Sequence, residues 1–575
     1  MEARTDLRAP AKPALMRDLF FRFLETVGIR YFFGNPGTTE LPLVDGVNDH
    51  PQVGYVLALH EDIAVAMAMG YARTSGKPGV VNLHVAPGLA HGLGNIYNAW
   101  RARMPLLITA GQHHSGVLVH EPILTADLAA LVRPFTKWAY EVRRTDELAI
   151  ALQRAFKEVL TPPVAPVFLS FPTDVLLAPL EGSPSAAVSR IGATLADGDA
   201  IDRACDVLAS ATRPMIVAGD GVGLADAWDE VAAVAEAWGA PVFTEELSTL
   251  WNFPTSHPHY VGALPNIAGA MRQRFEGVDV VLFCGFTAQA PVSRFDGAGP
   301  LVPPSVRVVA VHADPWEVGK NQAVEAGVLG DVKRNLAAIA DTLRTRTRGA
   351  RSEIDARARE VRATSSDRAA KLHARSEGAR RSATLTAPFV ASELAQLLPP
   401  RSIIVDEAIS NREAFVSFLR FDDPLSYFGA KGLSLGHSTG AAIGLKLGAP
   451  DRTVVNIVGD GSLMYYPQAL WSAANLGLPL VVLVVNNASY RVLKLIWHRW
   501  GGPWGESAEL PPGLNFGEPK IDFTKMAEGM GLKGERVDTP AALRPALERA
   551  LGSGGPYVLD VRIEQADSDA AGGAS

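Results

Sequence analysis

Short apolar runs alternate with amphipathic stretches along most of this chain. Residues 29–34, 214–218, 278–286 and 478–485 contain such runs, and Gly- or Pro-containing loops and helical patterns of apolar and polar positions separate them. Continuous apolar runs are typical of strands buried on both faces of a parallel sheet, and their alternation with helices indicates βαβ units. We therefore expect an α/β protein built from doubly wound parallel sheets.

The βαβ pattern occurs in three stretches, which predict three domains. They are an N-terminal domain over residues 13–185, a middle Rossmann-like domain over 195–342 and a third domain over 385–565. Residues 343–384 are rich in Lys, Arg and Ala without a strand-like run, so we expect a basic, exposed helical linker. An RNA- or phosphate-binding arm is the alternative for this linker, but it lacks interleaved aromatic residues.

Composition narrows the class of protein. With 54 Lys and Arg against 61 Asp and Glu, the net charge of −7 gives no general attraction to nucleic acid, and we expect no nucleic-acid partner. The apolar run at 478–485 is far shorter than the ~20 residues that span a bilayer, so we expect no membrane association. Cys205 and Cys284 have apolar neighbours and the N-terminus lacks a signal-peptide pattern, which favours buried free thiols and a cytoplasmic location.

Polar residues follow two apolar runs of the third domain and suggest a metal site. Asp460 comes directly after one run, and Asn487 follows the next one along the chain. Because the carboxyl ends of parallel strands meet at one edge of a sheet, these side chains are expected to lie together. A carboxylate, an amide oxygen and the backbone carbonyl of Ser489 are ligands that Mg²⁺ prefers.

The residues around Asp460 also suit a phosphate group. Gly459 and Gly461 allow a close approach to the backbone, and a helix expected to begin after Ser462 would direct its first N–H groups towards an anion. The pattern therefore predicts a diphosphate that is anchored through magnesium.

These motifs resemble the cofactor signature of thiamine-diphosphate-dependent enzymes. The stretches GNPGTTELP (34–42), NLHVAPGLAHGLGNIYNAW (82–100) and PLLITAGQ (105–112) resemble benzoylformate decarboxylase and its relatives most closely, and the resemblance covers nearly the whole chain. It implies thiamine diphosphate and Mg²⁺ as cofactors. It also implies that residues 13–185 form the pyrimidine-binding domain and 385–565 the diphosphate- and magnesium-binding domain.

The resemblance implies three catalytic roles in the first domain. Glu61 matches the glutamate that hydrogen-bonds the aminopyrimidine ring, His84 matches a proton-relay histidine, and Thr38 takes the place of a serine that contacts substrate. Without the resemblance, Glu61 would be interpreted as a helix-start residue favoured by the helix dipole, and His84 as a structural histidine.

Other residues match positions that contact the cofactor. Leu435 corresponds to the bulky apolar residue that wedges beneath the cofactor, although alone it would be assigned to core packing. The cofactor-binding residues implied in this way are Pro36, Glu407, Ser410, Leu435, Gly459, Gly461, Ser462 and Tyr465.

The histidines depart from the benzoylformate decarboxylase pattern. Those enzymes carry a second active-site histidine in the middle domain, but residues 285–296 contain none. His113 and His114 stand where the relatives have no such pair, and one of them is a candidate replacement. Adjacent side chains on an extended segment point in opposite directions, so at most one faces the site. A solvent-facing pair, or a zinc site that includes His120, are the alternatives.

Two further histidines and one segment leave both a structural and a functional interpretation open. His91 stands where the relatives usually have Asn, and His437 follows the wedge residue. Residues 490–519 carry cations and tryptophans. They form either a lid over an acidic, aromatic or large acyl group or a surface helix and loop at a subunit contact.

The resemblance implies nonoxidative decarboxylation of a 2-oxo acid through a cofactor-bound enamine. The missing histidine keeps a second activity open, that of a carboligase or lyase acting on acyloins or 2-hydroxyacyl-CoA, and an acetolactate-synthase-like reaction is a further alternative. The expected partner is a small-molecule 2-oxo acid or acyl substrate. The resemblance also implies that Glu61 and Asp460 of one site come from different chains, which requires a homodimer and is commonly met in a homotetramer.

Two other classes of protein are disfavoured by the sequence. The glycines at 219–223 suggest a nucleotide-binding dehydrogenase, but they do not complete the dinucleotide fingerprint, and we expect a structural turn there. A noncatalytic paralogue is the other alternative. The presence of Glu61, Asp460 and Asn487 argues against it.

Overall fold

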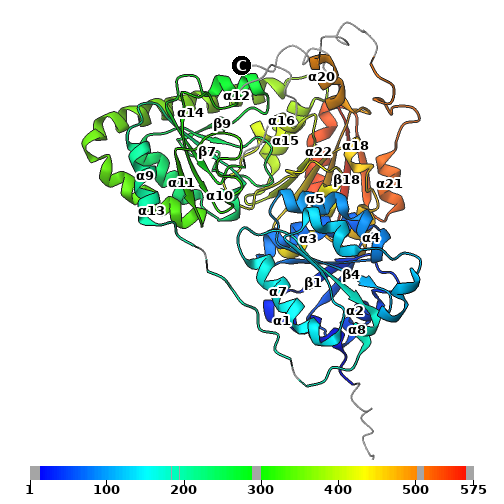
Figure 1. The fold of residues 1–575 in the computed structure, drawn as a ribbon. Helices are drawn as coiled ribbons and strands as arrows, with labels where there is room; N and C mark the ends of the chain where they lie inside the picture. The colour runs from blue at the N-terminus through cyan, green and yellow to red at the C-terminus, as the bar shows by residue number, and fades with distance from the viewer. Residues whose placement is uncertain (1–12, 183, 193, 288–299, 501–509, 565–575) are drawn as a thin grey trace, which may run out of the picture. The chain divides into compact units, whose positions relative to one another are not determined.

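Three parallel sheets form the framework of the protein (Figure 1). The computed structural model describes residues 13–182, 184–192, 194–287, 300–500 and 510–564. The chain divides into two compact units: the first comprises residues 1–72 and 76–191, and the second comprises 73–75 and 192–575. All three sheets have six strands, and all their strand pairs are parallel. The predicted α/β fold with three parallel sheets is therefore confirmed.

The first unit contains one sheet with the strand order β2-β1-β3-β4-β6-β5. Its strands are β1 (Tyr31–Gly34), β2 (Gly54–Leu57), β3 (Gly79–Leu83), β4 (Leu106–Gln112), β5 (Trp138–Glu141) and β6 (Val167–Pro172). Its helices are α1 (Met16–Val27), α2 (Leu41–Gly46), α3 (Glu61–Ser75), α4 (Val85–His91), α5 (Leu93–Arg101), α6 (Leu128–Val132), α7 (Leu148–Leu160) and α8 (Thr173–Leu177). The strand order reverses between β1 and β3, and ligands of α/β proteins bind at the carboxyl ends of strands at such a point.

The second sheet has the order β12-β11-β10-β7-β8-β9, which reverses between β10 and β7. Its strands are β7 (Pro214–Ala218), β8 (Val242–Thr244), β9 (Tyr260–Ala263), β10 (Val280–Cys284), β11 (Arg307–His312) and β12 (Ala326–Leu329). The accompanying helices are α9 (Gly198–Ala209), α10 (Asp220–Leu224), α11 (Trp228–Trp238), α12 (Ala268–Arg274), α13 (Val332–Arg346) and the long polar helix α14 (Arg351–Ala379). Cys205 and Cys284 are buried free thiols, as expected.

The backbone segments that follow β7 and β10 pack directly against each other at the point where the strand order of the second sheet reverses. Gly219 N–H donates to the Cys284 carbonyl and Gly221 N–H to the Gly285 carbonyl, both at 2.9 Å. A Cβ added to Gly221 would lie 2.6 Å from the Gly285 Cα, so only glycine allows this contact. The packing accounts for the glycine motif without a nucleotide.

The third sheet has the order β14-β13-β15-β16-β18-β17, the same relative order as the first. Its strands are β13 (Ile403–Glu407), β14 (Tyr427–Phe428), β15 (Val454–Gly459), β16 (Leu480–Asn486), β17 (Lys533–Val537) and β18 (Tyr557–Arg562). Its helices are α15 (Ala387–Leu397), α16 (Arg412–Phe418), α17 (His437–Gly448), α18 (Asp460–Leu463), α19 (Ala469–Asn475), α20 (Arg491–Trp500), α21 (Phe523–Gly529) and α22 (Pro540–Leu551). The order reverses between β13 and β15, so Glu407 and Asp460 lie at the ends of neighbouring strands.

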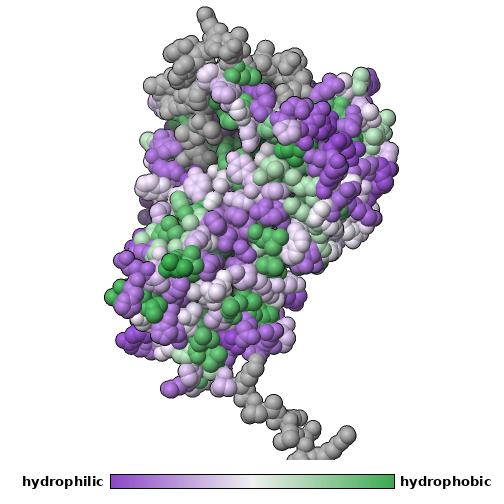
Figure 2. Space-filling view, turned by 90° about the vertical axis from the view of Figure 1, so that its right-hand side faces the viewer, coloured by the Kyte–Doolittle hydropathy of each residue, from purple (hydrophilic) through white to green (hydrophobic). Residues whose placement is uncertain are grey.

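Apolar side chains are mostly packed inside the units. Strands β3, β4 and β16 are buried along their whole length, as expected for parallel strands covered on both faces. On the face shown in Figure 2, apolar residues lie in small groups separated by polar ones. Within the described residues, no helix is both long and apolar enough to cross a membrane.

Candidate active site

The predicted metal ligands lie together at the ends of β15 and β16. The Asp460 carboxylate accepts the backbone N–H groups of Gly461 at 2.7 Å and Asn487 at 2.8 Å, together with that of Ala488. The side-chain oxygen of Asn487 accepts the N–H of Ser489 at 3.1 Å. These contacts hold a carboxylate and an amide oxygen in one cluster.

The Asp460 carboxyl group is buried in a way that disfavours its charge. Asp460 is 3% exposed, and burial raises the pKa of its carboxyl group to about 6. The backbone N–H groups oppose this shift, whereas the nearby charge of Asp560 adds to it. A cation on the remaining lone pairs of the carboxylate would relieve the unfavourable burial.

The helix expected after Ser462 begins earlier, at Asp460, so that prediction was wrong about the start. Gly459 keeps an extended backbone (φ −70°, ψ 148°), and the chain turns directly into the short helix α18. Gly461 is required by packing, because a Cβ there would lie 2.7 Å from the Tyr490 ring. A Cβ on Gly459 would lie 3.7 Å from the Glu407 carbonyl and from Ser462 Oγ, which is ordinary van der Waals contact, so packing does not require glycine at this position.

Glu407 ends the neighbouring strand and caps helix α17. Its carboxylate is fully enclosed and accepts the backbone N–H groups of Gly436 at 2.6 Å and Ser438 at 3.0 Å. The buried His437 ring places Nδ1 3.2 Å from Oε1 of Glu407. Burial alone would raise the pKa of Glu407, but His437 and Ser438 outweigh it and hold the pKa below its usual value.

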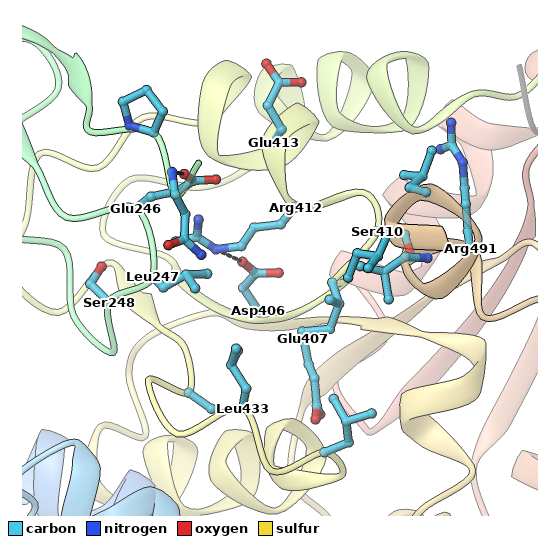
Figure 3. A pocket seen from close by; sticks show the side chains of 18 of the residues that line it. Glu246, Leu247, Ser248, Asp406, Glu407, Ser410, Arg412, Glu413, Leu433 and Arg491 are labelled. Carbon is cyan, nitrogen blue, oxygen red and sulfur yellow. Dashed lines mark hydrogen bonds and ion pairs between the residues drawn. The ribbon is translucent and has the colours of Figure 1, made fainter. Parts of the chain in front are cut away.

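A cavity of about 780 Å³ opens beside Glu407. Figure 3 shows Glu246 and Ser248 at one end and Arg491 at the other, with the Arg412–Asp406 ion pair between them. The cavity also brings together three residues that the sequence assigns to the cofactor, Glu407, Ser410 and Leu435.

Local backbone contacts shape the walls of this cavity. Ser410 Oγ accepts the N–H of Val492 at 3.0 Å and so fixes the start of α20. Leu433, in the segment leading to Leu435, has φ 59°, a strained conformation for a non-glycine residue. Arg491 and Val492 of α20 line the cavity. Residues 501–509, part of the segment that is either a lid or a surface loop, and residues 288–296 of the histidine-free stretch lie outside the described residues.

Tyr465 and Ser462, two other predicted cofactor residues, lie in and just after helix α18. Tyr465 is half-exposed, and its ring meets that of Tyr466 edge to face. Gly436 has φ 90°, and a Cβ there would lie 2.3 Å from the Tyr466 ring. Ser462 is buried in α18. Tyr465 and Tyr466 therefore pack against Gly436, whose backbone N–H donates to the Glu407 carboxylate.

In the first unit, Glu61 begins helix α3. The preceding residue, His60, caps the helix because its Nδ1 accepts the N–H of Asp62 at 3.1 Å. The Glu61 carboxylate is buried and contacts Nδ2 of Asn35 at 3.4 Å and Nδ1 of His91 at 3.2 Å. The structure thus joins Glu61 to His91, one of the histidines whose role the sequence leaves open.

His84 pairs with a carboxylate that sequence reasoning missed. Its Nδ1 lies 2.7 Å from Oε2 of Glu40, which is completely buried. Glu40 also accepts the N–H groups of Gly37 at 3.1 Å and Gly111 at 2.8 Å and the hydroxyl of Thr39 at 2.8 Å. A carboxylate at Nδ1 favours a proton on that nitrogen and leaves Nε2 as the acceptor. Glu40 could have been found in the sequence because it lies in the loop after a predicted strand. The structure shows that this strand, β1, borders the point where the strand order reverses.

The remaining predicted residues of the first unit make local contacts. Pro36 and Thr38 are exposed, and it is Thr39 that lies 3.4 Å from His84 Nδ1. His113 Nε2 contacts the Ile123 carbonyl at 2.8 Å, and His114 Nδ1 accepts the Gly116 N–H at 3.0 Å. These two hydrogen bonds therefore stabilise the loop to which the histidines belong.

Comparison with known proteins identifies the family. Residues 16–129, 201–339 and 410–561 match the thiamine pyrophosphate enzyme N-terminal TPP binding domain, central domain and C-terminal TPP binding domain. The benzoylformate decarboxylase of Pseudomonas aeruginosa is 31% identical over 547 residues, covering 94% of this chain and 97% of that enzyme. The chain belongs to the thiamine-diphosphate-dependent enzymes.

Other members of this family are similar over most of their length. An acetolactate synthase large subunit from Corynebacterium glutamicum is 29% identical over 543 residues, covering 92% of this chain and 83% of that protein. The thiamine diphosphate-dependent 4-hydroxybenzoylformate decarboxylase of Rhodococcus jostii RHA1 has a TM-score of 0.85 at 28% identity, covering 96% of this chain and 100% of that one. Benzoylformate decarboxylase from Polynucleobacter necessarius has a TM-score of 0.83 at 25% identity, covering 96% and 98%.

The third sheet of this thiamine-diphosphate-dependent enzyme fits a magnesium-bound diphosphate. It offers the buried Asp460 carboxylate with its raised pKa and the Asn487 side-chain oxygen. Hard oxygen donors of this kind match the preference of Mg²⁺. The residues present are therefore compatible with the family cofactor.

Proposed function

We propose that this enzyme removes carbon dioxide from a 2-oxo acid without oxidation. The observation that supports this best is the Glu40–His84 pair, in which a buried carboxylate lies 2.7 Å from the imidazole. After carbon dioxide leaves, the carbon that carried it must be protonated before an aldehyde can be released. An imidazole held in one tautomer by a carboxylate is suited to deliver that proton from Nε2.

We propose that residues from the first unit of one copy of the chain and from the second unit of another copy would hold the cofactor. Asp460, Asn487 and the Ser489 carbonyl would ligate Mg²⁺, and Glu61 would hydrogen-bond the aminopyrimidine ring. When bound, thiamine diphosphate supplies the carbon nucleophile and the electron sink for cleavage next to a carbonyl. In this proposal the Glu61 carboxylate holds or releases a proton at Oε1 or Oε2, and Leu435 excludes water from its side of the cavity.

We further propose that the active form is a homodimer at minimum, assembled in a homotetramer. The resemblance to the family supports this, because its members build each site from the pyrimidine-binding domain of one chain and the diphosphate-binding domain of another. The partner in catalysis is a small 2-oxo acid or acyl substrate.

A second candidate function is carboligation or the reverse cleavage of acyloins and 2-hydroxyacyl-CoA thioesters. The 29% identity to an acetolactate synthase supports keeping this candidate. The absence of a histidine from residues 285–296 also supports it, because slower protonation leaves more time for a second carbonyl compound to react.

The test is a product analysis of the purified protein with thiamine diphosphate and Mg²⁺. We expect benzoylformate or another 2-oxo acid to yield carbon dioxide and the corresponding aldehyde, and His84→Gln to lower kcat by about 100-fold. His373→Gln, which changes an exposed histidine of α14, is the control. Cleavage of hydroxyketones or acyl-CoA thioesters without carbon dioxide would favour the second candidate. No carbon dioxide from any 2-oxo acid would refute the first.

A further inference from the structure

We propose that His91 carries protons between Glu61 and solvent. This inference rests on the proposed role of Glu61 towards the cofactor and adds a second residue to it. In the transfer, a protonated His91 gives its Nδ1 proton to Oε2 of Glu61, which turns the carboxylate into a carboxylic acid and the imidazolium into neutral imidazole. His91 then regains a proton from water or buffer, so charge and protons balance.

The contact between the two side chains joins a buried group to an exposed one. His91 Nδ1 lies 3.2 Å from Oε2 of Glu61, and the side chains are 57% and 8% exposed, respectively. The other carboxylate oxygen, Oε1, faces Asn35 Nδ2 at 3.4 Å, and an amide cannot exchange a proton in this way. Of these two contacts, only the one to His91 gives Glu61 a titratable group that reaches water.

The neighbouring residue His60 supports the assignment of the proton transfer to His91. Its ring lies against that of His91 with centroids 5.3 Å apart and an angle of 28° between the planes. Burial lowers the pKa of His60, Glu61 opposes the shift, and His91 adds to it. His60 therefore favours its neutral form and caps α3, which leaves proton exchange to the more exposed ring of His91.

A metal site is the rival interpretation of these three residues. His60, Glu61 and His91 each offer a ligand atom, and these atoms lie within 4.8 Å of one another. However, Nδ1 of His60 already accepts the Asp62 N–H, so it carries no proton of its own. A neutral imidazole that binds a metal through Nε2 carries its proton on Nδ1. Metal binding by His60 would therefore break the helix cap, whereas proton transfer leaves it intact.

Tyr55 is another titratable group that interacts electrostatically with Glu61. Besides His60 and His91, the Glu61 carboxylate acts electrostatically on Tyr55, and so does the second buried carboxylate, Glu40. Burial is the main reason that the pKa of Tyr55 is raised, and both carboxylates add to it. Tyr55 thus stays protonated, which leaves His91 as the exchanging partner.

The test measures hydrogen–deuterium exchange at the thiazolium C2 position of bound cofactor, with binding affinity measured separately. We expect His91→Asn to slow exchange at least about tenfold near neutral pH while cofactor affinity, from fluorescence quenching, changes little. In His91→Ala, added imidazole buffer should restore the rate, which a purely structural role would not produce. The control is His373→Asn, which changes an exposed histidine of α14. Cofactor bound to this variant should exchange its C2 hydrogen at the same rate as in the unmodified protein.

A second measurement checks the contact itself without cofactor. In the cofactor-free protein, NMR should detect a hydrogen-bonded Nδ1–H signal that is absent from His91→Asn and displaced in Glu61→Gln. Exchange that is slowed by Glu61→Gln but not by His91→Asn would refute this inference alone. Normal exchange in Glu61→Gln would instead refute the proposed role of Glu61. Stoichiometric Zn²⁺ binding that His60→Asn abolishes would overturn the proton role in favour of a metal site.

Discussion

Asp460, Glu407 and Glu40 are carboxylates that the fold buries almost completely, at 3%, 1% and 0% exposure. Glu407 caps a helix and faces His437, and Glu40 accepts four hydrogen bonds, one of them from His84. Asp460 accepts backbone N–H groups, yet the pKa of its carboxyl remains raised. The pKa of Glu407 is lowered by its partners, whereas that of Asp460 is raised by burial, so Asp460 is the carboxylate that a bound cation would stabilise most.

Magnesium affinity is therefore expected to depend on pH through Asp460. Burial raises the pKa of this carboxyl to about 6 in the metal-free protein, and only the deprotonated form is a good ligand. Affinity should be constant above this pH and fall about tenfold for each unit below it. Magnesium titrations followed by tryptophan fluorescence between pH 5 and 8 would measure this. Asp460→Asn should bind weakly throughout, and a pH-independent affinity in the unmodified protein would contradict the assignment.

At the scale of elements, a buried ion cluster ties the second sheet to the third. Lys431, which follows β14 and is fully buried, places Nζ 2.8 Å from Glu245 and 3.4 Å from Asp220. Asp220 lies in α10 and also accepts the N–H groups of Thr249 and Leu250. Lys431 belongs to the same loop as Leu435, so the cluster fixes the segment that forms one wall of the cavity.

Lys431→Met is expected to destabilise the second unit by about 3–5 kcal/mol near pH 8, because two buried carboxylates lose their cation. Burial, opposed by Lys431, raises the pKa of Glu245 to about 7. Without Lys431 the native state binds a proton there more readily than the unfolded state does, so stability falls as pH rises. The loss in denaturant midpoint should therefore be smaller at pH 5.5 than at pH 8.

Lys446 provides the matched control for this variant. It is also buried, but its Nζ donates to the backbone carbonyls of Pro450 and Arg452 rather than to carboxylates. Lys446→Met should therefore destabilise the protein without the same pH dependence. Equal losses at both pH values for Lys431→Met would show that the carboxylates do not control the effect.

At the scale of the whole molecule, the two candidate half-sites lie in separate compact units. The first unit holds Glu61, His91, His84 and Glu40, and the second holds the Asp460 cluster and the cavity. The proposed function requires these half-sites to meet between two copies of the chain. Symmetric dimers allow this arrangement, because each copy then gives one half-site and receives the other.

Mixed oligomers of two inactive variants test the shared site. Glu61→Gln and Asp460→Ala should each be inactive alone. In a dimer containing one copy of each, one site is intact and the other carries both changes, so activity should return to about half that of the unmodified dimer. Differently tagged subunits purified together would give the measurement. No recovery in verified mixed dimers would place both residues of a site in one chain.

The local pattern of the sequence anticipated much of the fold and part of the site. Short, valine-rich apolar runs such as 478–485 were sufficient to predict parallel strands, because a strand covered on both faces is apolar throughout and the run is too short for a buried helix. The positions of Asp460 and Asn487 after two such runs predicted their proximity, since parallel strands end at the same edge. The start of α18 was misplaced because the backbone turns at Asp460 itself.

Pairs formed across long sequence separations were decided only by the tertiary structure. Glu40 meets His84, Glu61 meets His91 and Lys431 meets Glu245 over separations of 44, 30 and 186 residues. Such contacts depend on how loops at strand ends pack against one another, which the periodicity of each segment does not encode. The sequence by itself determined which strands form and which residues end them, and folding determined which of those residues share a proton or a charge.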